Sequence, residues 1–270
     1  MTIALAHDVR GDDTAPALLL GSSLGTTRAM WDPQHDPLAQ RLRVVRYDHP
    51  GHGASPAPPP GTTLADLGRS VLDLADRLDL QRFSYAGLSL GGMVGIWLAV
   101  HAPERVDRLA LLCTSAHLPP ALMWHERAAT VRAAGTCAAI SETVVSRWFT
   151  PGFAQRRPDV VASFTATLDG VDPEGYAACS EVIAAMDQRA GLGRITAPTL
   201  VIAGAQDPAT PPSGHADVIA RAVPGSLLVT LDPAAHLAGV EQPGAVTALL
   251  LEHVTAPRPD RATATAGARS

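Results

Sequence analysis

The sequence contains no lysine and no asparagine, and all 21 of its basic residues are arginine. The absence of lysine excludes a phosphate-binding loop built on a lysine and Schiff-base chemistry on a lysine amine. The absence of asparagine excludes an N-glycosylation sequon. Nucleotide hydrolysis on such a loop and imine-forming catalysis are therefore ruled out before any motif is considered.

Cysteine is also scarce, and long apolar runs are missing. The three cysteines, Cys113, Cys137 and Cys179, are an odd number without metal-ligand spacing. They predict free thiols in a reducing compartment and no metal site. No apolar run approaches the roughly 18 residues of a membrane span, and the initial MTIALAHDVRGDD is too short and too polar for a signal peptide. The expectation is a cytoplasmic protein that does not enter a membrane.

Acidic and basic residues are spread along the chain, which has a formal net charge of −5. Nucleic-acid-binding domains usually gather basic side chains on one face, so we expect no nucleic-acid partner. An apolar content of 46% over 270 residues is enough for a large buried core. These features do not determine the oligomeric state.

Apolar runs typical of strands alternate with helical runs through much of the chain. Strands are expected over residues 17–20, 43–47, 83–86, 106–112, 199–203 and 227–231. Helical periodicity is clear over 64–80, where Leu67, Val71 and Leu74 share one face, and 91–101 is a strongly apolar helix. The alternation predicts an α/β fold in which a mostly parallel sheet is covered by helices on both faces.

The alternation stops between residues 117 and 193, where helical segments occur without a convincing strand. The helices expected there cover residues 126–135, 138–149 and 176–189. We therefore predict a helical cap, residues 117–193, inserted into a core made of residues 1–116 and 194–255. The last residues, 256–270, include few large apolar side chains and are expected to form a disordered tail.

The most informative motif is Gly-Leu-Ser-Leu-Gly at residues 87–91, which matches G-x-S-x-G. It lies between the expected strand 83–86 and an apolar helix, where this motif forms a sharp strand-to-helix turn. Small residues are needed on both sides of the serine because strand and helix approach closely there. The turn also places Ser89 at a helix N-terminus, where backbone N–H groups favour negative charge. The motif predicts that Ser89 is a nucleophile; the alternative is a serine that only caps the helix.

A serine nucleophile needs a base, which in this arrangement follows an acid late in the chain. His236 comes just after the last expected strand, where α/β sheets gather catalytic groups. Asp207 follows the strand in TLVIAGA and is predicted to orient His236 and stabilise its charged form. Asp232 is the alternative acid, although it is close in sequence to His236 and on the same strand and loop. The other histidines considered lie in a glycine-rich turn, in helices or near the N-terminus: His52, His101, His253, His215 and His7.

Two backbone N–H groups are expected to bind the oxyanion that forms when the serine attacks a carbonyl. One belongs to Leu90, the residue after the nucleophile. The second should come from Gly-Ser-Ser-Leu-Gly at residues 21–25, directly after an expected strand. Ser23 provides it by position, and Leu24 is the alternative. Without such a role, this segment is an ordinary turn.

Several segments, in this order, resemble 3-oxoadipate enol-lactonases over roughly residues 15–255. They are MWDPQ, VVRYDHPGHGAS, YAGLSLGGMVG, ERVDRLALLCTSA, TLVIAGAQDPATPP and AAHLAGVEQP, with WHERAATVR and RWFTPGF from the helical middle. The sequence departs from the family at Pro50, where an arginine is common, and around His236. The resemblance implies an α/β-hydrolase fold and hydrolysis of 3-oxoadipate enol-lactone to 3-oxoadipate in the β-ketoadipate pathway. It also implies a Ser-His-Asp triad, an acyl-enzyme, and neither a metal nor a cofactor.

The small-molecule substrate implied by this resemblance is a lactone with a free carboxylate, which a guanidinium can bind through two hydrogen bonds. Arg127 is the candidate for this contact. Trp124, three residues earlier on about the same helical face, is expected to form an apolar wall, and Trp31 is a further candidate contact. The alternatives are a solvated or ion-paired arginine and tryptophans that pack in the core.

Other reactions are possible on the same triad, because a fold alone does not determine a function. They are those of a carboxylesterase, a C–C bond hydrolase and a cofactor-free haloperoxidase. Haloalkane dehalogenases and epoxide hydrolases are disfavoured because they need an aspartate in place of Ser89. A non-catalytic receptor for small ligands is an alternative of another class, and the intact set of Ser89, Asp207 and His236 argues against it.

Overall fold

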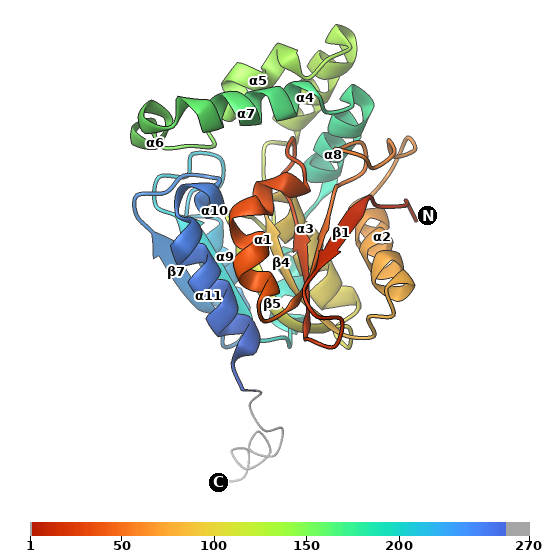
Figure 1. Cartoon of the computed structure of the whole chain (residues 1–270). Helices are drawn as coiled ribbons and strands as arrows, with labels where there is room; N and C mark the ends of the chain where they lie inside the picture. Colours follow the sequence, from red (N-terminus) through yellow and green to blue (C-terminus); the bar gives the residue numbers. More distant parts are fainter. Residues whose placement is uncertain (1, 258–270) are drawn as a thin grey trace.

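A single β-sheet forms the centre of the protein in the computed structural model, which describes residues 2–257 (Figure 1). In this part of the chain the sheet has seven strands, in the order β1-β3-β2-β4-β5-β6-β7. The edge strand β1 (His7–Arg10) is antiparallel to β3, and all other neighbours are parallel. The parallel strands are β2 (Ala17–Gly21), β3 (Arg43–Tyr47), β4 (Phe83–Leu88), β5 (Val106–Leu112), β6 (Thr199–Gly204) and β7 (Leu227–Leu231).

Helices cover both faces of this sheet. Because crossovers between parallel strands are right-handed, a reversal of direction across the sheet changes the face that the connecting helix covers. Helix α1 (Asp32–Ala39) connects β2 to β3. Helix α2 (Leu64–Arg77) connects β3 to β4 and α3 (Leu90–His101) connects β4 to β5, in the opposite direction across the sheet, and these two helices pack against each other. Helix α11 (Pro243–Thr255) packs beside α1 (Figure 1). The predicted architecture, a mostly parallel sheet between helical layers, is confirmed.

A group of helices stands over one edge of the sheet, at the carboxyl ends of the parallel strands (Figure 1). These helices are α4 (Ala121–Ala134), α5 (Ala138–Val145), α6 (Pro151–Arg156), α7 (Pro158–Asp169) and α8 (Pro173–Ala185). An isolated antiparallel bridge between His117 and Asp187 joins the two ends of the segment that contains these five helices. The helices occupy the part of the chain for which a helical cap was predicted, and they bring side chains to the strand ends.

The sequence analysis missed strand β1 and the helices α1, α6 and α7. Strand β1 is a short edge strand, His-Asp-Val-Arg, with no buried residue, so it lacks the apolar signal of the central strands. Strand β1 forms through its pairing with β3 and has no strong local pattern of its own. In α7 only Leu168 is fully buried, although Val160, Val161 and Phe164 are partly buried and pack against the core. The apolar residues of α7 do recur at helical spacing, and this pattern was overlooked.

The core is made of apolar side chains on both faces of the central strands. Leu18, Leu19 and Leu20 are consecutive residues of β2, and all three are fully buried. A continuous buried run of this kind is typical of a parallel strand between two helical layers. Cys113, Cys137 and Cys179 are buried and form no disulfide, as the odd number of cysteines predicted.

In residues 2–257, no helix combines the length and the apolar character that crossing a bilayer requires. The predicted tail, residues 256–270, lies outside the described part of the chain from residue 258 on.

Candidate active site

Ser89 lies in the turn between β4 and α3, at the carboxyl end of a central strand. Its backbone has φ +56° and ψ −116°, a conformation that a non-glycine residue rarely adopts. The Ser89 N–H donates to the carbonyl of Leu112 (2.9 Å), and its own carbonyl accepts from the Thr114 hydroxyl (2.6 Å). Strained residues that their surroundings hold in place cluster at functional sites, so this geometry agrees with the predicted nucleophile turn.

Glycines on both sides of Ser89 allow the turn to form. A Cβ atom on Gly87 would lie 2.3 Å from the backbone of Gly91, and one on Gly91 would lie 2.3 Å from the carbonyl oxygen of Gly21. The obstructing atoms belong to the backbone, so a side-chain movement cannot relieve either clash. The small residues expected two positions before and after Ser89 are therefore a steric requirement of the close approach between strand and helix.

Asp207 and His236 form a buried pair. The Nδ1 atom of His236 lies 2.9 Å from Asp207 Oδ2. Oδ1 of Asp207 accepts the N–H groups of Ala209 (2.8 Å) and Thr210 (3.1 Å), and Oδ2 accepts the Thr210 hydroxyl (2.7 Å). Burial raises the pKa of Asp207, but the interactions with His236 and Thr210 outweigh it and lower the pKa below its ordinary value. The ionised carboxylate keeps a proton on Nδ1, which leaves Nε2 of His236 free to accept one.

The loop that holds His236 is fixed from two sides. The next N–H, that of Leu237, donates to the carbonyl of Trp148 (2.9 Å). The N–H that precedes His236 donates to Glu241 (2.7 Å), and Glu241 also accepts the hydroxyl of Thr150 (2.7 Å). Trp148 and Thr150 belong to the helical segment above the sheet. The position of the imidazole therefore depends on that segment as well as on β7.

Ser89 and His236 line the same cavity. Within the described residues no hydrogen bond joins the Ser89 hydroxyl to His236, and such contacts often tighten only when a substrate is bound. The alternative acid Asp232 is exposed and accepts a hydrogen bond from Gln206 (3.3 Å). The partner of His236 is thus Asp207.

The two predicted oxyanion donors come from neighbouring strands, because β2 pairs with β4. Leu90 is the first residue of α3, so its N–H has no partner in the helix. Ser23 lies in the loop after β2, and the preceding carbonyl, that of Ser22, accepts the N–H of Gly91 (3.0 Å). His49 Nε2 donates to the same carbonyl (2.8 Å). These two hydrogen bonds fix the loop against the start of α3.

Two buried histidines hold this loop on either side of Ser23. His52 Nε2 accepts the N–H of Gly25 (3.0 Å), and its Nδ1 donates to a carbonyl in its own turn (3.0 Å). His49 has the opposite tautomer, because its Nε2 donates to the carbonyl of Ser22. Burial lowers the pKa of His49 to about 3 and also lowers that of His52. Both rings are therefore neutral near pH 7, each with the tautomer that its partner requires.

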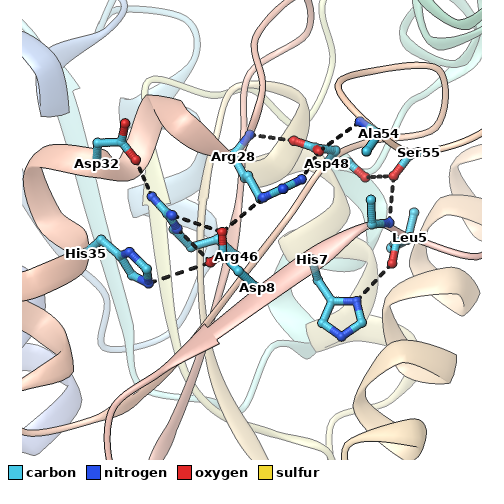
Figure 2. Close-up of polar contacts among 11 residues, drawn as sticks. Leu5, His7, Asp8, Arg28, Asp32, His35, Arg46, Asp48, Ala54 and Ser55 are labelled. Carbon is cyan, nitrogen blue, oxygen red and sulfur yellow. Dashed lines mark hydrogen bonds and ion pairs between the residues drawn. The ribbon is translucent and has the colours of Figure 1, made fainter.

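A charged network holds the far end of the same loop (Figure 2). Asp48, just after β3, accepts the backbone N–H groups of Arg28 (2.7 Å) and Ala54 (3.2 Å). The Arg28 guanidinium bridges Asp48 and Asp8, and Arg46 pairs with Asp8 (2.9 Å). None of these five residues lines the cavity of Ser89. The network supports the loop and does not meet the reacting atoms.

The cavity has a volume of about 290 Å³ and lies between the strand ends and the helices above them. Ser23, Ser89 and His236 line it from the sheet side, and Trp124 and Arg127 line it from α4. Most of the residues predicted from the sequence therefore meet at one place. Among residues 2–257, no cluster of three or more His, Cys, Asp or Glu side chains is arranged to hold a metal ion.

Arg127 stacks on Trp124 inside this cavity. Its Cζ atom lies 4.6 Å from the centroid of the Trp124 ring, within the range of a cation–π contact. Trp124 is itself fixed, because its indole N–H donates to the carbonyl of Leu118 (3.0 Å). Arg132 on the same helix is paired with two glutamates of α8, whereas no ion pair of Arg127 occurs within residues 2–257. Arg127 is thus not the ion-paired helix residue considered as an alternative.

Trp31 does not reach the cavity, and the predicted substrate contact is wrong for this residue. It lies at the end of a short 3-10 helix (Arg28–Trp31) and is 1% exposed, within the main hydrophobic core. The packing role considered as the alternative for Trp31 is the one observed.

Several residues that line the cavity were not predicted to do so, among them Arg147, Tyr176 and His215. Tyr176 is fully buried, its hydroxyl interacts with the Arg127 guanidinium, and no acceptor for the hydroxyl proton occurs among residues 2–257. His215 was expected within a polar helix, but it precedes α9 (Ala216–Ala222) and faces the cavity. No motif marks these residues, since each comes from a different element and only folding brings them together.

Comparisons with known proteins cover nearly the whole chain. Residues 16–136 match a family model described as the alpha/beta hydrolase fold. The 3-oxoadipate enol-lactonase 2 of Acinetobacter baylyi is 39% identical over 90% of this chain and 90% of that protein. A hydrolase from Pseudomonas aeruginosa PA01 has a TM-score of 0.89 at 45% identity, covering 93% of this chain and 94% of that one. The enol-lactonase from Burkholderia xenovorans LB400 has a TM-score of 0.90 at 37% identity, covering 93% and 96%.

Proposed function

Because this chain belongs to the 3-oxoadipate enol-lactonase family of α/β hydrolases, we propose that it hydrolyses 3-oxoadipate enol-lactone to 3-oxoadipate through an acyl-enzyme on Ser89. The observation that carries the proposal is one cavity lined by Ser89, His236 and Arg127, in which His236 is hydrogen-bonded to the buried Asp207 and Arg127 has no ion-pair partner among residues 2–257. A simple esterase needs only Ser89, His236 and Asp207. A carboxylated lactone also needs a positive charge at a distance from the nucleophile.

The reaction begins when the Ser89 hydroxyl attacks the carbonyl carbon of the lactone. Nε2 of His236 takes the hydroxyl proton, and the ionised Asp207 stabilises the imidazolium that forms. The start of α3 contributes backbone N–H groups and a favourable dipole for negative charge. His236 therefore acts as the base and Asp207 as the acid that orients it, while the turn presents the Ser89 hydroxyl to the cavity.

The carbonyl oxygen becomes an oxyanion and is bound by the N–H groups of Leu90 and Ser23. One donor of this kind typically contributes about 3 kcal/mol to lowering the barrier. Preorganisation supports the assignment, because the carbonyl just before Ser23 and the N–H of Gly25 are both held by buried histidines. The donors then do not have to reorganise during the reaction.

The tetrahedral intermediate collapses when the ring C–O bond breaks. His236 gives its proton to the leaving oxygen, which becomes an enol and is a better leaving group than an ordinary alkoxide. The enol converts to the ketone of 3-oxoadipate. Water activated by His236 then attacks the ester on Ser89 and releases the acid, which regenerates both side chains.

Arg127 is proposed to hold the carboxylate of the substrate, with Tyr176 as a second donor. The guanidinium is presented by its stacking on Trp124 and can form two hydrogen bonds to a carboxylate. The Tyr176 hydroxyl is buried and interacts with the Arg127 guanidinium, which can only donate, so the hydroxyl proton has no acceptor among residues 2–257. Burial raises the pKa of Tyr176 to about 12, although Arg127 opposes this, so the hydroxyl keeps its proton. An unsatisfied buried donor has a free-energy cost that a bound carboxylate would remove.

The test follows the ultraviolet absorbance of freshly generated 3-oxoadipate enol-lactone with the wild type and with Ser89→Ala. We expect fast loss of the lactone with the wild type and a fall in kcat on the order of 10⁶-fold in the variant, since the hydroxyl is the nucleophile. A wild type that does not exceed spontaneous hydrolysis, yet still cleaves p-nitrophenyl acetate, would retain a serine hydrolase and refute the lactonase.

A further inference from the structure

We propose that His215 is a further substrate-contacting residue of this cavity, which binds the leaving oxygen of the opened lactone ring and keeps it from attacking the acyl-enzyme again. The inference rests on the proposed lactonase reaction and deepens it. A partner for the leaving oxygen matters for a lactone and not for a simple ester, because only a lactone keeps its leaving group attached to the acyl group.

The imidazole of His215 is held in one orientation by Ser115. Nδ1 of His215 lies 2.8 Å from the Ser115 hydroxyl oxygen, which joins the segment after β5 to the segment after β6. The Ser115 hydroxyl donates its own proton to the carbonyl of His117 (2.6 Å). Its oxygen can therefore only accept from His215, so Nδ1 carries the ring proton.

Nε2 of His215 is the atom left to meet a molecule in the cavity. The ring lines the cavity, and within residues 2–257 Nε2 has no hydrogen-bond partner. Burial lowers the pKa of His215, so the ring is neutral near pH 7 and Nε2 is a hydrogen-bond acceptor. The cavity therefore offers an acceptor for a substrate hydroxyl, in addition to the acid and base of the triad.

The sheet order places His215 on the side of Ser89 from which a leaving group departs. Ser23, with its oxyanion N–H, follows β2 on one side of the nucleophile strand β4. Ser115 follows β5, His215 follows β6 and His236 follows β7, all on the other side. When the carbonyl oxygen points to the donors after β2, the ring oxygen lies toward His236 and His215. The imidazole of His215 is thus placed to accept a hydrogen bond from the new hydroxyl.

A tethered leaving group makes the first chemical step easy to reverse. When the bond from Ser89 Oγ to the carbonyl carbon forms and the ring C–O bond breaks, the Ser89 proton passes through His236 to the ring oxygen. The resulting enol hydroxyl stays on the same molecule as the acyl group, and well-oriented groups of this kind react with effective molarities of about 10⁵–10⁸ M. A hydrogen bond from that hydroxyl to His215 Nε2 draws it away from the acyl carbon while water attacks.

The experiment compares a cyclic and an open enol ester, after wild-type turnover of the lactone has been established. 3-Oxoadipate enol-lactone keeps its enol attached, whereas isopropenyl acetate releases an enol that diffuses away. With His215→Ala we expect kcat/KM to fall about tenfold on the lactone, the effect of one lost hydrogen bond, and to stay within about twofold on isopropenyl acetate. His215→Gln, which keeps an acceptor, should recover part of the loss, and His101→Ala, at an exposed histidine of α3, should change neither rate.

Trapping of the acyl-enzyme gives a second measurement, which would not change if His215 had only a structural role. At lactone concentrations well below KM, added hydroxylamine competes with ring closure for the acyl group. It should raise lactone consumption by His215→Ala more than that by the wild type, with Ser89→Ala as the control for the uncatalysed reaction. The role of His215 would be overturned by any of three results: an equal loss of kcat/KM on both esters, no loss of kcat/KM on the lactone, or an equal effect of hydroxylamine on the wild type and His215→Ala. A wild type without lactone turnover refutes the proposed function instead.

Discussion

Replacing His52 by alanine tests whether the buried histidines position the oxyanion hole. The change removes the acceptor of the Gly25 N–H, which lies 3.0 Å from Nε2 in a fully buried site. Gly25 is two residues from Ser23, so a loop freed at Gly25 also frees the proposed donor. His52 does not line the cavity of Ser89, and any effect on the reaction must pass through the loop.

The structure sets the size of the expected effects. One buried N–H without an acceptor costs about 1–3 kcal/mol of folding free energy, which lowers stability without unfolding a typical domain. If the Ser23 N–H moves out of line, the barrier rises by about 3 kcal/mol, the usual effect of losing one oxyanion donor. We therefore expect kcat to fall by about 10²-fold, with little change in KM because the oxyanion exists only beyond the ground state.

The assay measures kcat and KM on the enol-lactone for the wild type, His52→Ala and His52→Gln, with urea unfolding of each protein. Glutamine carries an oxygen acceptor near the position of Nε2, so His52→Gln should recover most of kcat. A boronic acid that binds Ser89 as a tetrahedral adduct should lose affinity in parallel with kcat. If His52→Ala keeps wild-type kcat although it is destabilised, or raises KM alone, the positioning role is wrong.

Two further predictions concern the carboxylate contact and the response to acid. Arg127→Ala should lower kcat/KM about tenfold or more on the carboxylated lactone and leave isopropenyl acetate unchanged, because only the lactone presents a carboxylate; equal losses on both substrates would contradict the contact. His49 is neutral when folded, with its pKa lowered to about 3 by burial, but binds a proton below about pH 6.5 when unfolded. Stability should therefore fall as the pH drops from 6.5 toward 3, and between pH 7 and 5 His49 alone should account for about 2 kcal/mol. His49→Gln, which keeps the donor to Ser22, should show a shallower loss in urea unfolding at the two pH values; an unchanged slope would show that His49 is not responsible.

The predictions from sequence were most accurate where chemistry and backbone geometry are local. The turn around Ser89 needs glycine at Gly87 and Gly91 because backbone atoms lie 2.3 Å from where their Cβ atoms would be. This steric requirement can be recognised in the sequence as the five-residue motif at residues 87–91. The central strands were also found, since a parallel strand buried on both faces is a short apolar run.

The predictions failed where contacts alone determine the role of a residue. Trp31 lies in the conspicuous segment MWDPQ, but its side chain packs in the core. His215 was set aside as a helix residue, and Tyr176 was not considered at all, yet both line the cavity. A rotation of one residue along a helix turns a side chain by about 100°, so the residues that face the cavity depend on how α8 and the segment before α9 pack.

The sequence by itself determined the α/β class, the nucleophile turn and the order of Ser89, Asp207 and His236, because these follow from local patterns and from the strand ends at which they occur. Only the tertiary structure decided which acid meets His236, which tautomers His49 and His52 adopt, and which side chains close the cavity. These outcomes depend on atoms that lie far apart in the chain, such as Gly25 and His52 or Ser115 and His215. Their positions are set by the packing of helices over the sheet, which no local pattern encodes.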